Sequence, residues 1–294
     1  MSSILLDRVA VRVAVDGRPD LKTLLHEQTL RLTEQRIGII GANGSGKSTL
    51  LRLLNGLVAP SSGTVTVGQW DTVRAVREVR RRVGFVFTDP LSQLVMPTGR
   101  EDVELSLRRS VRNGRERSRQ AEATLDRFGL LPLADQSIYE LSGGERQLLA
   151  LAAVLDVDPE VLVLDEPSTL LDLRNRELLR RTLAGLSQQV ILSTHDLELA
   201  LDLDRVLVVD AGAVVFDGVP TAAVAHYRAL CGAGLPPTLG GPSAAGPSDA
   251  GPSVAGPSVG GPSVAGHPLP AAPGGGRLPA GAGTGPDPLH PGRP

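Results

Sequence analysis

The chain has 294 residues, a formal net charge of −2 and an aromatic content of 2%. A near-neutral chain with so few aromatic side chains argues against a nucleic-acid-binding surface, so we expect no nucleic-acid partner. No apolar run of about 18 residues or more occurs in it, so we expect the chain not to cross a membrane by itself.

The first predicted elements are two strands. Val9, Val11, Val13 and Val15 alternate with other residues, and the segment 64–67 carries a second strand signal. Such alternation is typical of half-buried strands. We expect both to belong to a small antiparallel sheet.

A glycine-rich loop follows the apolar run 36–40 and precedes the helix-like segment 50–54. Strand, glycine loop and helix come in the order that a phosphate-binding P-loop needs. The glycines let the backbone turn with its N–H groups pointing inward, which makes an anion nest at a helix N-terminus. We predict that Lys47 reaches the β- and γ-phosphates of ATP and that Ser48 holds Mg²⁺. The predicted ATP-binding residues are Gly41, Ala42, Asn43, Gly44, Ser45, Gly46, Lys47, Ser48 and Thr49.

The middle of the chain predicts a strand over 83–87 and then an inserted helical region over about 91–140. Helices are expected near 98–109 and 115–128, the second ended by Gly129. Arginines cluster in this region, and they form either a solvated helix face or a docking surface for a membrane partner or anionic lipid headgroups. They are Arg108, Arg109, Arg112, Arg115, Arg117 and Arg119.

A second glycine pair begins another helix-like run. Ser142, Gly143 and Gly144 precede Glu145 and then a largely apolar segment. Ser-Gly-Gly at a helix start predicts a small anion site, and the same residues also fit a plain N-capped helix with Glu145 in support. The two interpretations are compatible.

Two further apolar strands each deliver polar residues at their ends. The strand over 161–165 ends in Asp165 followed by Glu166, and the strand over 189–194 is followed by His195. Hydrolysis of ATP needs a metal clamp and a positioned water. We predict that Asp165 holds Mg²⁺ and that Glu166 polarises the attacking water. For His195 a structural role is the alternative, because a lone histidine after a strand is usually structural.

The last ordered elements are predicted to be a strand over 205–209, a terminal hairpin through 213–216 and a helix over 219–230. Gly-Pro-Ser triplets then begin at 241, 246, 251, 256 and 261. A segment rich in glycine and proline cannot bury enough apolar surface in a core to offset the conformational entropy that it would lose on ordering. Residues 232–294 are therefore predicted to be a disordered Gly/Pro/Ser/Ala-rich tail. The single cysteine, Cys231, permits no internal disulfide and suits a reducing cytosol.

The motifs together resemble those of the ATP-binding cassette family over about residues 1–231. The resemblance is most specific for ATPases of energy-coupling factor importers, because 87–98 and 101–103 are similar to a recurring stretch of that group. The segments 36–40, 95–98 and 169–173 look most like the biotin-importer subunit.

This resemblance implies an α/β fold: a P-loop cassette with a mostly parallel core sheet, a small antiparallel β-subdomain and the inserted α-helical subdomain. It implies an ATPase with ATP and Mg²⁺ as cofactors. His195 would contact the γ-phosphate and act with Glu166 in catalysis. Ser142, Gly143 and Gly144 would cap the ATP that is held by the P-loop of another subunit.

The expected partners are a membrane-embedded coupling protein, a substrate-binding membrane subunit and a second cassette ATPase, in a homodimer or a heterodimer. The expected location is the cytoplasmic face of the cell membrane, as a peripheral protein. An importer for cobalt, nickel or another vitamin is the alternative within the family. A soluble cassette ATPase of DNA repair or translation is the alternative from another class, but the chain has neither a long coiled-coil insertion nor a second cassette.

Two positions depart from the family pattern. Thr88 stands where the family has a glutamine that approaches Mg²⁺ and links the site to the membrane partner. Gln93 lies further along the loop and is not expected to replace it. The segment 11–19 lacks the aromatic residue that commonly stacks on adenine, so weak base recognition is expected.

Overall fold

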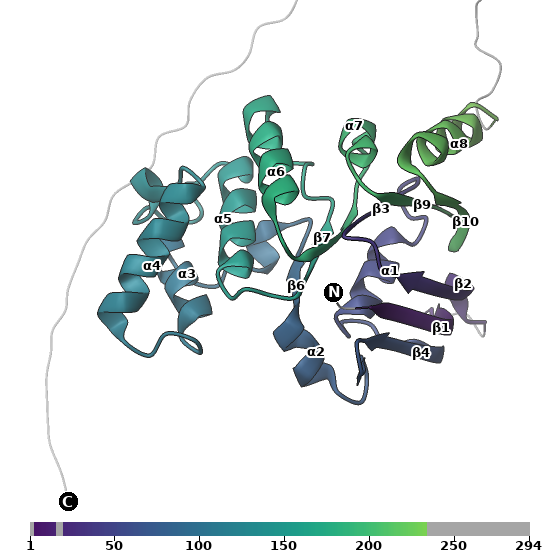
Figure 1. Cartoon of the computed structure of the whole chain (residues 1–294), viewed down its shortest axis with the longest axis horizontal. Helices are drawn as coiled ribbons and strands as arrows, with labels where there is room; N and C mark the ends of the chain where they lie inside the picture. The colour runs from purple at the N-terminus through teal and green to yellow at the C-terminus, as the bar shows by residue number, and fades with distance from the viewer. Residues whose placement is uncertain (1–2, 16–19, 234–294) are drawn as a thin grey trace, which may run out of the picture. The chain divides into compact units, whose positions relative to one another are not determined.

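Two sheets with a helix between them organise the chain (Figure 1). The computed structural model describes residues 3–15 and 20–233. The small sheet is antiparallel and has the strand order β2-β1-β4-β5. Its strands are β1 (Ile4–Val13), β2 (Lys22–Leu32), β4 (Ser62–Val67) and β5 (Trp70–Asp71).

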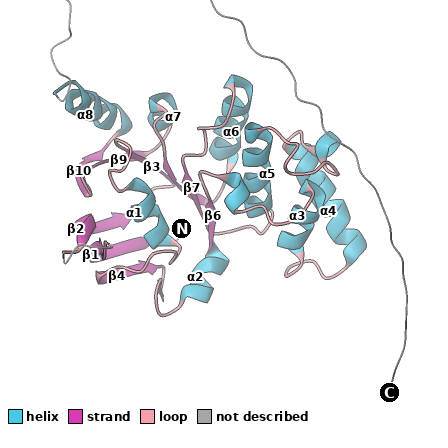
Figure 2. Cartoon of the chain, turned by 180° about the vertical axis from the view of Figure 1, so that it is seen from behind, coloured by secondary structure: helices cyan, strands magenta, loops and turns pink. Residues whose placement is uncertain are grey.

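The core sheet has the order β10-β9-β3-β8-β7-β6, and only its edge strand β10 runs antiparallel to its neighbour. Helix α1 (Lys47–Leu54) lies between the two sheets, and α2 (Val76–Arg82) packs on the same side of the core sheet, against β5 and β6. The helices that pack on the other face are α5 (Gly143–Leu155), α6 (Leu173–Gly185), α7 (Leu197–Leu201) and α8 (Pro220–Ala233) (Figures 1 and 2). The predicted α/β cassette fold with its small antiparallel subdomain is confirmed. The core strands are β3 (Arg36–Ile40), β6 (Val83–Val86), β7 (Val161–Asp165), β8 (Gln189–Ser193), β9 (Arg205–Asp210) and β10 (Ala213–Gly218).

The core strands are buried on both faces, which explains why they appear in the sequence as continuous apolar runs. In β7, Val161 and Val163 pack into the core beneath the small sheet, whereas Leu162 and Leu164 pack into the core on the helical side. Alternate residues therefore serve opposite cores, as the two-residue period of a strand requires.

The helical subdomain contains α3 (Gly99–Leu107) and α4 (Gly114–Arg127), close to the predicted ranges. Thr98 and Asn113 cap these helices by accepting hydrogen bonds from backbone N–H groups of their first turns. Gly129 has a φ of 69°, which turns the chain away after α4 as predicted. The short 3₁₀ turns η1 (Pro90–Ser92) and η2 (Leu131–Leu133) flank this pair, and α5 (Gly143–Leu155) packs against it.

Several elements differ from the sequence predictions. Strand β1 begins at Ile4 and ends at Val13, and its alternation is interrupted because register shifts place Val9 and Val11 on the buried side together with Ala10. Strand β2 was not predicted, because its charged and polar residues obscure its period. The unpredicted helices are α2 (Val76–Arg82), α6 (Leu173–Gly185) and α7 (Leu197–Leu201).

The chain's last described helix is α8 (Pro220–Ala233), which includes Cys231 and extends three residues past the predicted end. The predicted disordered tail over 232–294 lies, apart from the end of this helix, outside the described residues. Within the described part of the chain, no helix has the length and apolar character that crossing a membrane requires.

A half-buried carboxylate ends α5 and gives the fold a pH dependence. Asp156 accepts a hydrogen bond from the Thr124 hydroxyl at 2.7 Å, while its other carboxylate oxygen is buried without a partner. Burial raises the pKa of Asp156 above its ordinary value, with the Thr124 bond opposing this.

Ionisation of Asp156 is therefore less favourable in the folded protein than in the unfolded chain. The stability of the folded protein falls as the pH rises above the ordinary carboxyl pKa. We expect the stability of Asp156→Asn relative to wild type to increase between pH 4 and pH 7. Urea unfolding at both pH values measures this. A stability difference that stays the same at both values would contradict it.

Candidate functional site

The P-loop joins β3 to α1 and places two glycines where other residues do not fit. A Cβ on Gly41 would lie 2.1 Å from the Val209 carbonyl oxygen. Gly46 precedes α1 with a φ of 111°, in the conformation that favours glycine. The loop thus approaches β9 closely and leads directly into the N-terminus of α1, where backbone N–H groups are free to bind an anion.

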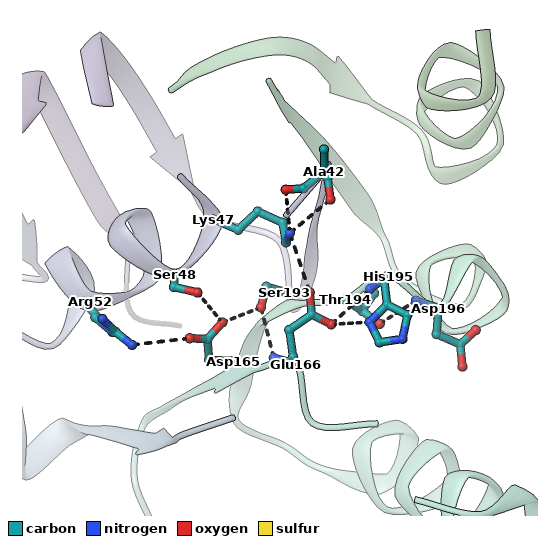
Figure 3. A network of polar contacts seen from close by, with 11 residues as sticks. Ala42, Lys47, Ser48, Arg52, Asp165, Glu166, Ser193, Thr194, His195 and Asp196 are labelled. Atoms are coloured by element: carbon teal, nitrogen blue, oxygen red, sulfur yellow. Dashed lines mark hydrogen bonds and ion pairs between the residues drawn. The ribbon is translucent and has the colours of Figure 1, made fainter. Parts of the chain in front are cut away.

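Lys47 extends across this loop. Its Nζ donates hydrogen bonds to the Gly41 and Ala42 carbonyl oxygens at 3.0 and 3.1 Å and lies 3.6 Å from a carboxylate oxygen of Glu166 (Figure 3). The side chain is 7% exposed. A single buried cation therefore connects the phosphate loop to the acid that follows β7.

Asp165 ends β7 as a buried carboxylate among hydroxyl groups. Its Oδ1 accepts hydrogen bonds from Ser48 at 2.9 Å and from Ser193 at 2.7 Å, and its Oδ2 lies 4.0 Å from the Arg52 guanidinium. A carboxylate next to a serine hydroxyl is an oxygen donor set of the kind that Mg²⁺ prefers. The residues present therefore fit the predicted metal, which Ser48 and Asp165 would hold.

Glu166 and His195 form a contact pair at the ends of β7 and β8. Glu166 Oε2 accepts a hydrogen bond from the His195 backbone N–H at 3.1 Å and lies 2.7 Å from His195 Nδ1 (Figure 3). Glu166 has a φ of 52°, which is rare for a residue with a side chain. Its backbone N–H donates to the Ser193 hydroxyl at 3.0 Å, so the neighbouring strand helps to hold this conformation.

Ser193 is a site residue that the sequence analysis missed. Its hydroxyl donates to Asp165 and accepts from the backbone of Glu166, so it fixes both acids. The side chain is fully buried. A hydroxyl at the end of an otherwise apolar strand, two residues before His195, was the available signal.

A cavity of about 410 Å³ lies beside the P-loop. The turn between β9 and β10 is attached to the loop, because the Gly212 N–H donates to the Ser45 carbonyl oxygen at 2.8 Å. The cavity offers a place for the rest of a nucleotide next to the phosphate nest. It is lined by Lys22, Thr23, Leu24, Gly44, Gly46, Lys47, Ser48, Thr49, Ala211 and Gly212.

The second predicted anion site lies elsewhere in the fold. Ser142 caps α5, its hydroxyl accepts from the Glu145 N–H, and the Glu145 carboxylate accepts in return from the Ser142 N–H. The predicted N-cap is thus present. Among the described residues, Ser142, Gly143 and Gly144 are not part of the lining of the P-loop cavity.

The loop that carries Thr88 is attached to α5 by two glutamines that were not predicted to act there. Gln93 donates to the Ala150 carbonyl oxygen at 3.1 Å and accepts from the Phe87 N–H at 3.4 Å. Gln147 donates to the Phe87 carbonyl oxygen at 3.4 Å. Thr88 itself is exposed. Gln93 therefore holds the loop against α5, and its inability to replace the missing glutamine stays a prediction.

The sequence model of the ABC transporter family matches residues 28–169 of the chain. The biotin transport ATP-binding protein BioM of Rhizobium etli is 44% identical over 207 residues, which cover 70% of this chain and 92% of BioM.

Two solved structures are similar as well. A dimeric post-hydrolysis state of the ATP-binding cassette MJ0796, bound to ADP and Pi, matches with a TM-score of 0.68 and 28% identity, covering 74% of this chain and 98% of that one. CbiO1 from Clostridium perfringens is described as part of the transporter complex cbiONQ. It matches with a TM-score of 0.65 and 27% identity, and the match covers 78% of this chain and 93% of CbiO1.

Proposed function

Since the chain belongs to the ABC transporter family as an ATP-binding subunit with ATPase activity, we propose that it powers an importer of the energy-coupling factor type for a vitamin such as biotin. The contact of Glu166 with His195, beside Lys47 and the Asp165–Ser48 pair, is the observation that carries the catalytic part of this proposal. The 44% identity to BioM supports the biotin part.

We assign the first steps of hydrolysis to the residues around the P-loop. The N–H groups at the start of α1 bind the β- and γ-phosphates, and Lys47 exchanges its contacts with Gly41 and Ala42 for phosphate oxygens. Ser48 and Asp165 would hold Mg²⁺, which would supply positive charge to neutralise the charge that develops on the phosphates.

Glu166 is placed to orient the attacking water and to accept its proton, because its carboxylate is held from two sides. His195 fixes one oxygen, and Lys47 lies near the other. A general base needs such a fixed position within reach of its water. Holding Glu166 is therefore the first role that we assign to His195, with contact to the γ-phosphate as the second.

We further propose that a second cassette completes the site. Lys47 and Ser48 line the P-loop cavity, whereas the Ser142–Gly144 helix start of the same chain is not among its described lining residues. Two cassettes arranged about a two-fold axis would each supply what the other site lacks. The dimeric form of MJ0796 supports this arrangement.

The membrane partners that we propose are a membrane-embedded coupling protein and a substrate-binding subunit, with this chain at the cytoplasmic face of the membrane. An importer for cobalt, nickel or another vitamin is the second candidate, favoured by the match to CbiO1. A soluble cassette ATPase without a membrane partner is the candidate from another class.

The experiment that separates these candidates is purification of the tagged chain from detergent-solubilised membranes of its own cells. We expect two integral membrane proteins to copurify, and biotin to raise the ATPase rate of the reconstituted complex. Stimulation by another vitamin or by a metal ion would replace biotin in the proposal. Recovery of the chain without any membrane protein would favour the soluble ATPase.

A further inference from the structure

Four arginines are concentrated at the connection between α3 and α4. Arg108, Arg109, Arg112 and Arg115 are exposed, and within the described residues their side chains have no hydrogen-bond or ion-pair partner. We call them the arginine turn. The nearby acids Glu104 of α3 and Glu116 of α4 are paired with other arginines, Glu104 with Arg117 and Glu116 with Arg119. The turn therefore has four positive charges without local neutralisation.

The second arginine-rich segment of the chain shows the opposite arrangement. Arg81 and Arg82 pair with Glu78, and Arg80 donates to backbone carbonyl oxygens of Asn55 and Gly56. Those arginines stabilise α2 and connect it to the segment that follows α1. Packing and local pairing explain Arg80, Arg81 and Arg82, but they do not explain the arginine turn.

The backbone of the arginine turn is held in place by its own bonds. The Val111 N–H donates to the Leu107 carbonyl oxygen at 2.8 Å, and the Arg117 guanidinium donates to the Val111 carbonyl oxygen at 3.2 Å. Asn113 caps the start of α4. The four charges are therefore presented on a preformed turn, and binding would order only their side chains.

The surroundings of the turn favour a lipid surface over a macromolecular partner. Among the described residues, no large hydrophobic side chain is exposed between Val95 and Tyr139. Protein interfaces rely on buried apolar or aromatic anchors, which this surface lacks. Nucleic-acid surfaces combine basic groups with stacking aromatics, and residues 99–127, which carry the arginine turn, contain no aromatic side chain. Anionic headgroups need only the positive charge.

We propose that the arginine turn binds the anionic phospholipids of the membrane surface next to the importer. This inference rests on the proposed function for the nearness of the membrane, but the affinity itself belongs to the isolated chain. A basic side chain near an anionic bilayer strengthens binding about five-fold, so four of them together give about 10²- to 10³-fold. The attraction is screened within about one Debye length, so it depends on salt.

The test is co-sedimentation of the purified chain with vesicles of phosphatidylcholine, with or without phosphatidylglycerol. The test variant is R108Q/R109Q/R112Q/R115Q. The matched control is R12Q/R31Q/R77Q/R228Q, which removes four exposed arginines from other parts of the surface and so has the same net charge. Circular dichroism and the basal ATPase rate check that both variants fold.

We expect the chain to bind only the anionic vesicles, and high salt to abolish binding. The test variant should lose at least about 10²-fold in affinity, and the control less than about five-fold. Equal losses of vesicle affinity in both variants would overturn the proposal. So would a wild-type chain that does not bind anionic vesicles. If the test variant lost its copurifying membrane proteins while vesicle binding was absent, the turn would be a protein contact instead. Vesicle binding uses no importer, so its result is independent of whether the proposed function holds.

Discussion

Glu166→Gln is expected to slow ATP hydrolysis by about 10²-fold or more while leaving ATP binding nearly intact. The amide has the shape of the carboxylate and can still accept the hydrogen bond from the His195 N–H. It cannot take a proton from water. ATP and Mg²⁺ should therefore hold two chains together, since the step that releases them is blocked.

Size-exclusion chromatography with light scattering, with and without ATP, measures the trapped dimer, and phosphate release measures the rate. Glu177→Gln is the matched control, because Glu177 is exposed and pairs with Arg181 on α6. This control should behave as wild type. A Glu166→Gln chain that remains monomeric with ATP and hydrolyses it at the normal rate would refute the assignment of Glu166.

Lys47→Ala is expected to weaken ATP binding by at least about 30-fold, because removing one partner of a buried charged contact costs about 2 kcal/mol or more. The substitution removes the cation that would contact the phosphates. It also leaves the Gly41 and Ala42 carbonyl oxygens without their donor and Glu166 without its nearest cation.

Isothermal titration with a slowly hydrolysed ATP analogue gives the affinity. Lys22→Ala is the matched control, since Lys22 lines the same cavity but makes no bond to the P-loop. This substitution should change the affinity only a few-fold. Retained tight binding in Lys47→Ala would count against the P-loop assignment.

The sequence predicted those parts of the fold in which local chemistry is distinctive. Glycines 41, 44 and 46 require the conformations that the structure shows, and apolar runs such as 161–165 are recognisable as buried strands. The acids at the end of β7 and the histidine after β8 were predicted separately as site residues, and their contact was not predicted. The structure places Glu166 and His195 2.7 Å apart, because parallel strands end at the same edge of a sheet.

The remaining features depend on contacts between distant segments, and no local pattern encodes them. Strand β2 is recognisable only through its pairing with β1, and the bulges of β1 disrupt the expected alternation. Ser193 can contact Asp165 and Glu166 because β8 lies beside β7. Gln93 can bond to α5 because its loop folds back on that helix. Sequence spacing does not specify such pairings.

The central claim is that a complete ATP site needs the P-loop of one cassette and the Ser142 helix start of another. The most direct measurement is the ATPase rate of an equal mixture of Lys47→Ala and Ser142→Arg chains, under conditions in which the wild-type chain alone is active. Each variant alone has no complete site. In the mixed dimer, the Ser142→Arg chain supplies an intact P-loop and the Lys47→Ala chain an intact Ser142.

We therefore expect the mixture to recover up to about a quarter of the wild-type rate, since about half of the dimers are mixed and each has one complete site of two. A mixture that stays as inactive as its two components would contradict the account. So would a Ser142→Arg chain that is fully active by itself.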